Sequence, residues 1–357
     1  MGATIAPVRE IVILIPDLYL ARGTEAQGAP ADLGPVPGLE YAGRFGERAQ
    51  LAGGWREWLA RWVGHEELAQ RSVAAIAAAS LAPSPAPAGA ATLWIATPVR
   101  LIAGLTRVHL DHRGIVRLPH AELTVLAADF YRTFGASGLA LQPLCDGNLL
   151  LAAPGLAPVA TVEPARCAGG EVTVPHGPAA APLLRLAAEI EMWLHGAALN
   201  EARAARGESP VTALWLWGAE RRAPPPGATV FAGTARVGPQ PATLAFGSDA
   251  YLRGLWHLHG EVSRPLPGRL EEVLAQGTER AVLVVEVADE LRGNVQWTVA
   301  QAVAELDRRL IGPVLRALRD GVLERMSVVV NDTLVAVGRR SGLKRWRRPR
   351  AGLAGFA

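Results

Sequence analysis

Three aspartates stand where a carboxylate could hold a ligand or a metal ion. Each follows a short, almost wholly apolar run that polar or turn residues bring to an end. The runs and their aspartates are residues 11–15 with Asp17, residues 280–287 with Asp289, and residues 326–330 with Asp332. Such runs are typical of central strands buried on both faces, and α/β proteins bind ligands beyond the carboxyl ends of these strands. The pattern therefore predicts a shared carboxylate site, with capping of the next helix as the alternative for Asp17.

A second polar group recurs at three-residue steps near the end of one predicted helix. Asn200, Arg203 and Arg206 are spaced so that they share a helix face. A planar guanidinium binds carboxylates and phosphates in a fixed geometry. The row predicts a site for a small anionic ligand or a protein partner. Two alternatives remain: a solvated helix face, or an internal brace in which Arg203 neutralises the strand-end aspartates.

The helix that carries this row is the most distinctive stretch of the chain. Apolar residues recur at three- and four-residue steps from Leu183 to Leu199, which is the pattern of a helix with one buried face. Gly207 and Pro210 should end it, and residues 211–217 should then form a buried strand. A second long helix is expected over residues 297–321.

Length and local composition predict two units. The chain has 357 residues, which is more than a single core usually supports. A Pro/Ala-rich linker at residues 81–91 marks a change of unit. We expect residues 91–180 to form a small inserted α+β domain, and residues 1–90 and 181–357 to form one larger α/β domain.

Charge and cysteine content restrict the functional class. The net charge is only +3, and the basic residues gather near the C-terminus, at residues 339–350. This distribution does not indicate specific nucleic-acid binding. Two cysteines without CxxC spacing indicate a reduced, cytoplasmic protein with no zinc site. Neither a signal peptide nor a transmembrane segment is expected.

The order of these motifs resembles that of the cofactor-independent phosphoglycerate mutases of archaeal type, in the alkaline phosphatase superfamily. It is similar in particular to bacterial phosphoglycerate-mutase-like proteins described as regulatory protein, RpfE-type. The stretches that carry the resemblance are the region of Asp17, residues 194–220, residues 284–318 and residues 328–332. The resemblance implies an alkaline-phosphatase-like, doubly wound sheet with a small inserted domain.

In catalytic relatives, the resemblance implies two divalent metals at the strand ends, histidine ligands and a serine that accepts the phosphoryl group. Asp17, Asp289 and Asp332 match the family's aspartates. Gly293 and Thr333, however, replace two metal-binding histidines. Residues 25–71, where the serine should lie, contain no Ser, Thr or Cys, and Gly54 and Trp55 occupy its expected place.

These departures predict a degenerate, non-catalytic protein with binding or regulatory function, without a bound metal or other cofactor. Its strand-end carboxylates are then vestigial. The alternative is an active phosphoglycerate mutase or phosphatase that uses two divalent ions, Mn or Mg, with relocated ligands such as His257 and His259.

Overall fold

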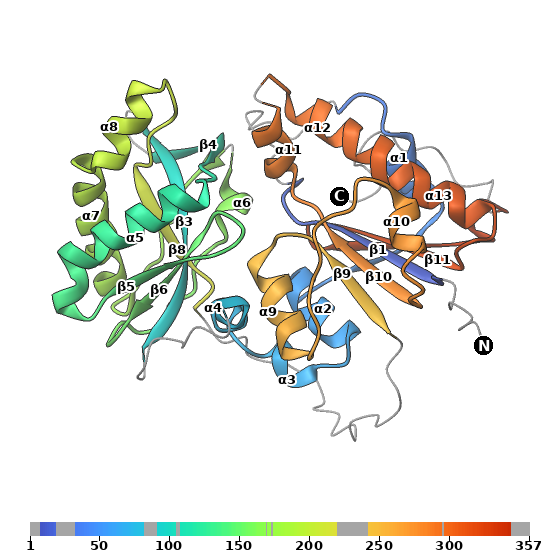
Figure 1. The fold of residues 1–357 in the computed structure, drawn as a ribbon, viewed down its shortest axis with the longest axis horizontal. Helices are drawn as coiled ribbons and strands as arrows, with labels where there is room; N and C mark the ends of the chain where they lie inside the picture. The colour runs from blue at the N-terminus through green and yellow to red at the C-terminus, as the bar shows by residue number, and fades with distance from the viewer. Residues whose placement is uncertain are drawn as a thin grey trace.

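The chain builds two units, each based on one β-sheet (Figure 1). The computed structural model describes residues 8–18, 33–81, 91–104, 108–168, 170–172, 174–219, 242–294 and 296–343. The chain begins the first unit, passes through the whole second unit and then returns to complete the first. None of the helices in these ranges combines the length and the apolar composition that crossing a membrane requires.

The sheet of the first unit has the strand order β2-β12-β11-β1-β10-β9. β11, β1, β10 and β9 are parallel; at one edge β12 pairs antiparallel with β11, and β2 pairs antiparallel with β12. The strands are β1 (Glu10–Ile15), β2 (Glu47–Gln50), β9 (Thr243–Phe246), β10 (Arg280–Val284), β11 (Arg325–Val330) and β12 (Thr333–Gly338). The three predicted apolar strands are therefore neighbours at the centre of this sheet.

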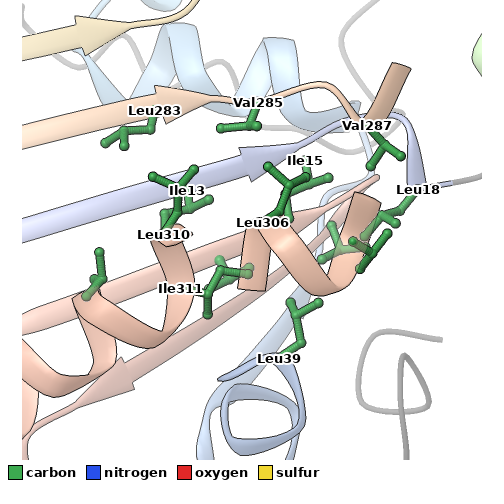
Figure 2. Packing of buried hydrophobic residues seen from close by; sticks show 14 of the residues in the cluster. Ile13, Ile15, Leu18, Leu39, Leu283, Val285, Val287, Leu306, Leu310 and Ile311 are labelled. Atoms are coloured by element: carbon green, nitrogen blue, oxygen red, sulfur yellow. The ribbon is translucent and has the colours of Figure 1, made fainter. Parts of the chain in front are cut away.

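Helices cover both faces of the first sheet. Ile13 and Ile15 of β1 pack against α1, α12 and α13, as Figure 2 shows in part, whereas Val12 and Leu14 pack against α2 and α9. The helices of this unit are α1 (Pro37–Phe45), α2 (Gly54–Trp62), α3 (Glu66–Ala69), α4 (Val73–Ala78), α9 (Ala250–Leu258), α10 (Leu270–Leu274), α11 (Val287–Gly293), α12 (Val299–Leu306) and α13 (Gly312–Arg319). Alternate residues of one strand thus enter two cores, and the predicted doubly wound α/β class is confirmed.

α12 and α13 are joined by a π-helical turn, η4 (Asp307–Ile311), so the helix predicted over residues 297–321 is continuous but locally widened. Asp307 in this turn is buried and accepts hydrogen bonds from the backbone N–H groups of Gly38 (3.0 Å) and Leu39 (2.7 Å). It therefore satisfies the first turn of α1, whose own N-cap residue, Val36, has no side-chain acceptor.

The second unit is built on the sheet β5-β6-β3-β4-β7, with β8 on the other side of β3. Its strands are β3 (Thr92–Ala103), β4 (Val108–Ile115), β5 (Ala140–Pro143), β6 (Leu149–Ala153), β7 (Gly170–Glu171) and β8 (Ala213–Trp217). Its helices are α5 (His120–Phe134), α6 (Pro164–Cys167), α7 (Ala180–His195) and α8 (Ala198–Ala205). Short 3-10 turns lie at η2 (Ala79–Leu81), η3 (Gly135–Ser137) and η5 (Ser341–Leu343).

The predicted boundary of the inserted domain at residue 180 was wrong. α7 packs through Leu183, Leu186 and Ile190 into the core of the second unit, and β8 pairs with β3. The inserted unit therefore extends to residue 219. The predicted single helix is also broken at Gly196, where α7 ends. Gly207, by contrast, adopts the left-handed conformation expected of a helix-ending glycine, with a φ of 71°.

Candidate functional site

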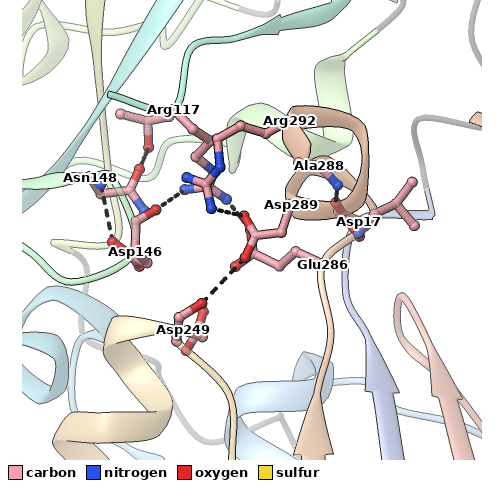
Figure 3. Close-up of polar contacts among 12 residues, drawn as sticks. Asp17, Arg117, Asp146, Asn148, Asp249, Glu286, Ala288, Asp289 and Arg292 are labelled. Carbon is pink, nitrogen blue, oxygen red and sulfur yellow. Dashed lines mark hydrogen bonds and ion pairs between the residues drawn. The ribbon is translucent and has the colours of Figure 1, made fainter. Parts of the chain in front are cut away.

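The carboxyl ends of β11, β1 and β10 meet at one edge of the first sheet, and the second unit covers this edge. Asp17 follows β1, Asp289 lies in the helix after β10, and Asp332 follows β11. Figure 3 shows Asp17 and Asp289 at this edge, with Arg117 extending from the second unit to Glu286. The three carboxylates therefore lie at one edge of the sheet, where they face groups that the sequence analysis did not predict.

Asp17 is a helix cap. Its two carboxylate oxygens accept hydrogen bonds from the backbone N–H groups of Val287 and Ala288, both at 2.8 Å. It thereby satisfies the start of α11 rather than that of the next helix in the sequence. Burial raises the pKa of Asp17 to about 6, although the two N–H donors and Arg117 act in the opposite direction.

Arg117 is the central cation of this edge. It lies between β4 and α5, donates to the backbone oxygen of Asp146 at 2.9 Å, and forms an ion pair with Glu286. Both side chains of this pair are only 10% exposed. Burial lowers the pKa of Arg117, but Glu286, Asp289 and other nearby carboxylates raise it by more, so the guanidinium stays charged.

Glu286 shares this crowded environment. Burial raises the pKa of Glu286 well above its usual value, Arg117 opposes the shift, and Asp289 and Asp17 add to it. Carboxylates outnumber guanidinium groups around this point. The edge therefore holds excess negative charge that favours the binding of protons.

The other two strand-end aspartates are also paired with arginines. Asp289 forms an ion pair with Arg292 at 3.2 Å and accepts a hydrogen bond from the hydroxyl of Ser248 at 3.3 Å. Asp332 forms an ion pair with Arg166, which belongs to α6 of the second unit. At the two positions that lack histidine, Thr333 donates to Gln50 at 3.1 Å, and Gly293 ends α11.

Arg56, in the first turn of α2, forms a second junction between the units. Its guanidinium donates to both carboxylate oxygens of Glu163, at 2.8 and 2.9 Å, and lies 3.9 Å from Asp249. It also stacks over the rings of Trp55 and Trp217, at 4.4 and 4.9 Å from their centroids. Bidentate pairing and stacking together hold this arginine in one orientation.

Two cavities adjoin these ion pairs. The smaller, of about 30 Å³, lies among Asp17, Arg56, Arg117 and Glu286 and has room for little more than water. The larger, of about 380 Å³, lies between the units and is lined by Trp55, Arg56, Thr161, Glu163, Arg166 and Asp332, among others. We call the larger one the inter-unit cavity.

Three buried polar atoms on residues that line the inter-unit cavity have no hydrogen-bond partner among the described residues. They are Nε1 of Trp55, Nε of Arg56 and Oγ1 of Thr161. The first two can only donate, and the hydroxyl can donate as well. Because a buried donor without an acceptor is costly, these groups favour a ligand that carries oxygen acceptors.

The expected position of a catalytic serine is filled by backbone and by Glu57. A Cβ atom at Gly53 would lie 1.9 Å from the carboxylate of Glu57, so a side chain there would have to displace that carboxylate. Gly54 has a φ of 75°, a conformation that L-residues rarely adopt. The start of α2 therefore presents neither a hydroxyl nor an uncovered helix terminus.

The row of Asn200, Arg203 and Arg206 lies far from this edge and is internally satisfied. Asn200 exchanges hydrogen bonds with the backbone of Val211, at 2.8 Å each. Arg203 is buried and donates to the backbone oxygen of Ser209 at 2.8 Å and to Glu122 at 2.6 Å. Arg206 pairs with Glu122 as well, and with Glu208.

The ligand-facing role predicted for this row does not agree with these contacts. The hydrogen bonds that were predicted for an anion are instead made with Val211 and Glu122. Through these bonds the row connects α8 to α5 and to the segment that leads into β8. The brace alternative describes Arg203 better, but its partner is Glu122 rather than any of the strand-end aspartates.

His257 and His259, the proposed relocated ligands, do not approach the strand ends. His257 is exposed on α9, and His259 follows the helix, where its Nδ1 lies 2.6 Å from Nε2 of His65. Among the described residues, no three His, Cys, Asp or Glu side chains come together as a metal-binding group. The guanidinium groups of Arg117 and Arg166 lie against the strand-end carboxylates, so these residues do not fit a two-metal centre.

No protein-family model and no curated protein matches this sequence. Among solved structures, the fold is similar to that of the PH0037 protein from Pyrococcus horikoshii, with a TM-score of 0.46 and 12% identity over 93% of this chain and 88% of that chain. It is also similar to the cofactor-independent phosphoglycerate mutase from Thermoplasma acidophilum DSM 1728, with a TM-score of 0.37 and 14% identity over 92% and 89% of the two chains. At these values no residue role is carried over from either structure.

Proposed function

We propose that this chain is a non-catalytic relative of the cofactor-independent phosphoglycerate mutases. In this proposal it acts as a cytoplasmic binding or regulatory protein, which is the role implied by its resemblance to RpfE-type regulatory proteins. It takes a small anion in the inter-unit cavity. Cys145 and Cys167 are not joined in a disulfide bond, which suits a reducing compartment.

The observation that carries the proposal is the pairing of strand-end carboxylates with arginines. A divalent ion placed beside Asp17 or Asp332 would lie next to Arg117 or Arg166 and be repelled by it. A phosphoryl-transfer site of the family type needs cations and a nucleophile at the same point. Here the cations are fixed guanidinium groups, and the nucleophile position is glycine.

The anion assignment rests on the unsatisfied donors of the inter-unit cavity. In this proposal, a carboxylate or phosphate in the cavity accepts from Trp55 and Arg56 and binds the hydroxyl of Thr161; all three residues line the cavity. Arg56 and Arg166 supply the positive charge, although Glu163 and Asp332 already pair with them. The ligand should therefore bind mainly through directed hydrogen bonds rather than through net charge.

Calorimetric titration of the full chain with inorganic phosphate and with 3-phosphoglycerate tests the proposal. Thr161→Val keeps the side-chain shape and removes one donor, so binding should weaken by about fivefold to tenfold, the effect of about 1 to 1.5 kcal/mol for one lost hydrogen bond. Trp55→Phe should act in the same direction. Thr133→Val, on the exposed side of α5, is the matched control and should leave binding unchanged.

A mutase assay with added manganese separates the proposal from its alternative. We expect no interconversion of phosphoglycerates above background, because no hydroxyl stands at the start of α2. Turnover that depends on manganese would instead support an active mutase or phosphatase with relocated ligands. Failure of both anions to bind would refute the cavity assignment.

A further inference from the structure

A second site of interest is a cavity in the second unit, away from the strand-end carboxylates. It has a volume of about 570 Å³ and is lined by α7, by the ends of β3 and β4, and by β8. Leu101, Val108, Leu184, Ala187 and Trp215 are among its lining residues. We call it the side cavity. Its volume lies within the range of small-molecule sites, which are mostly apolar with a few polar groups.

Apolar side chains remain exposed around the side cavity. Val108, Val162, Val174 and Leu184 all line it, and their exposed fractions are 42%, 36%, 44% and 38%. A single exposed apolar residue is unremarkable, but several that converge on one hollow indicate a binding surface. An apolar ligand would remove these side chains from water.

The charged groups that line the side cavity, among the residues described, are both acidic: Glu171 and Glu191. On α7, Glu191 lies four positions after Ala187 and seven after Leu184. At these spacings Leu184, Ala187 and Glu191 share one face of the helix. Burial raises the pKa of Glu191, as expected for a carboxylate at the border of apolar surface. A cation beside it would offset that unfavourable environment.

From this combination we propose that the side cavity binds a small organic cation with an apolar body. The apolar body packs between Leu184, Ala187 and Trp215, and the cationic group pairs with Glu191. The site does not depend on the proposed anion site, since the two cavities share only Thr161 and Val162 among their lining residues. The test variants are therefore all placed on α7.

The test is calorimetric titration of the full chain with 2-naphthylmethylamine, with 2-naphthylmethanol as the uncharged isostere and 2-naphthoate as the anion. We expect the amine to bind about tenfold more tightly than the alcohol, and the naphthoate to bind most weakly. Glu191→Gln should lower the affinity for the amine to that for the alcohol, with the alcohol unchanged. Glu189→Gln is the matched control, because Glu189 is exposed on the same helix and does not line the cavity.

A variant that fills the cavity locates the site independently. Ala187→Phe should abolish binding of both amine and alcohol while the thermal unfolding temperature stays close to that of the wild type. If Ala187→Phe fails to fold, Leu184→Gln, at a partly exposed position, should weaken both ligands instead. Equal affinities for amine and alcohol, a response of Glu189→Gln equal to that of Glu191→Gln, or binding that survives both α7 variants would overturn the proposal.

Discussion

At the scale of single residues, arginine side chains act as the counter-ions of the strand-end carboxylates. Arg117 and Arg166 reach across from the second unit to the edge that Asp17, Glu286 and Asp332 occupy. A guanidinium is permanently charged and forms several directed hydrogen bonds, so it can neutralise carboxylates without any bound ion. Such a pair is fixed at folding, and losing one partner leaves the other buried and uncompensated.

Removal of Arg117 should therefore be strongly destabilising. We expect Arg117→Ala to lower the free energy of unfolding by about 3 to 5 kcal/mol, because it leaves Glu286 buried without its partner. The control is Arg292→Ala, whose side chain is 50% exposed and whose loss should cost about 0 to 1 kcal/mol. Urea denaturation of both variants measures this, and equal losses would show that Arg117 is not a buried counter-ion.

Arg203 and Arg206 form a second matched pair, since both contact Glu122. Arg203 has a side chain that is 8% exposed, whereas that of Arg206 is 46% exposed. Arg203→Ala should cost about 3 kcal/mol or more, and Arg206→Ala about 1 kcal/mol or less. Thermal and urea unfolding check the difference. Variants of equal stability would restore the ligand-facing interpretation of Arg203.

Asp249 gives a prediction about pH. It caps α9 by accepting from the backbone of Leu252 at 2.7 Å, and burial raises its pKa to about 6 against the opposing effect of Arg56. The folded state therefore binds a proton that the unfolded state, with a pKa near 4, has released. Stability from this group is present below pH 4 and is lost as pH rises from about 4 to about 6.

Asp249→Asn keeps a good N-cap residue and removes the titration. The wild type should lose about 1 to 3 kcal/mol more than this variant between pH 4 and pH 6.5. Urea denaturation across this pH range tests the prediction. Parallel curves for the two proteins would show that Asp249 is already ionised at low pH in the folded state.

At the scale of elements, the widened turn η4 ties two helices together. It places Asp307 under the start of α1, and Gly38 must be glycine because a Cβ there would lie 2.7 Å from Oδ1 of Asp307 and 2.8 Å from Ile311. Asp307 in the turn can accept hydrogen bonds from the first backbone N–H groups of α1 because glycine at position 38 leaves room for its carboxylate.

Asp307→Ala should cost about 1 to 3 kcal/mol, because two buried N–H groups lose their acceptor. Gly38→Ala should cost a similar amount through overpacking, about 1 to 3 kcal/mol. The double variant should cost less than the sum by at least about 0.5 kcal/mol, since removal of the carboxylate makes room for the new methyl group. Strict additivity in urea denaturation would refute the proposed contact.

Elements with a strong local signal were predictable from the sequence. Residues 11–15 and 326–330 are apolar on both sides because both faces of β1 and β11 are covered by helices or strands. Two elements that form before Trp55, α1 and β2, were not predicted from the sequence. All residues of β2 are exposed, so the strand has no apolar pattern. The capping group of α1 is Asp307, which is distant in the sequence, so α1 has no N-cap signal of its own.

At the scale of the whole molecule, the sequence could not show how the units meet. Arg117 and Glu286 are 169 residues apart, and Arg166 and Asp332 are 166 apart. No local pattern links them, so the site was predicted with its carboxylates and without its cations. The boundary at residue 180 failed for a related reason: β8 follows a long helix but pairs back to β3. Long-range pairing of this kind is a property of the fold rather than of a segment.

The central claim concerns the whole molecule, because it depends on cations that one unit supplies to carboxylates of the other. If Arg117 and Arg166 are the counter-ions of the strand ends, their guanidinium groups occupy the space beside the carboxylates and repel a divalent ion placed there. If the arginines only accompany a metal centre, the carboxylates should still bind metal tightly.

Calorimetric titration of the full chain with manganese tests this most directly. We predict no saturable binding with a Kd tighter than about 1 mM, in protein purified without chelator and shown by elemental analysis to be metal-free. Arg292→Ala serves as a control with one surface charge removed and should behave in the same way. Saturable binding of one or two manganese ions at micromolar concentration, lost in Asp332→Asn, would contradict the account.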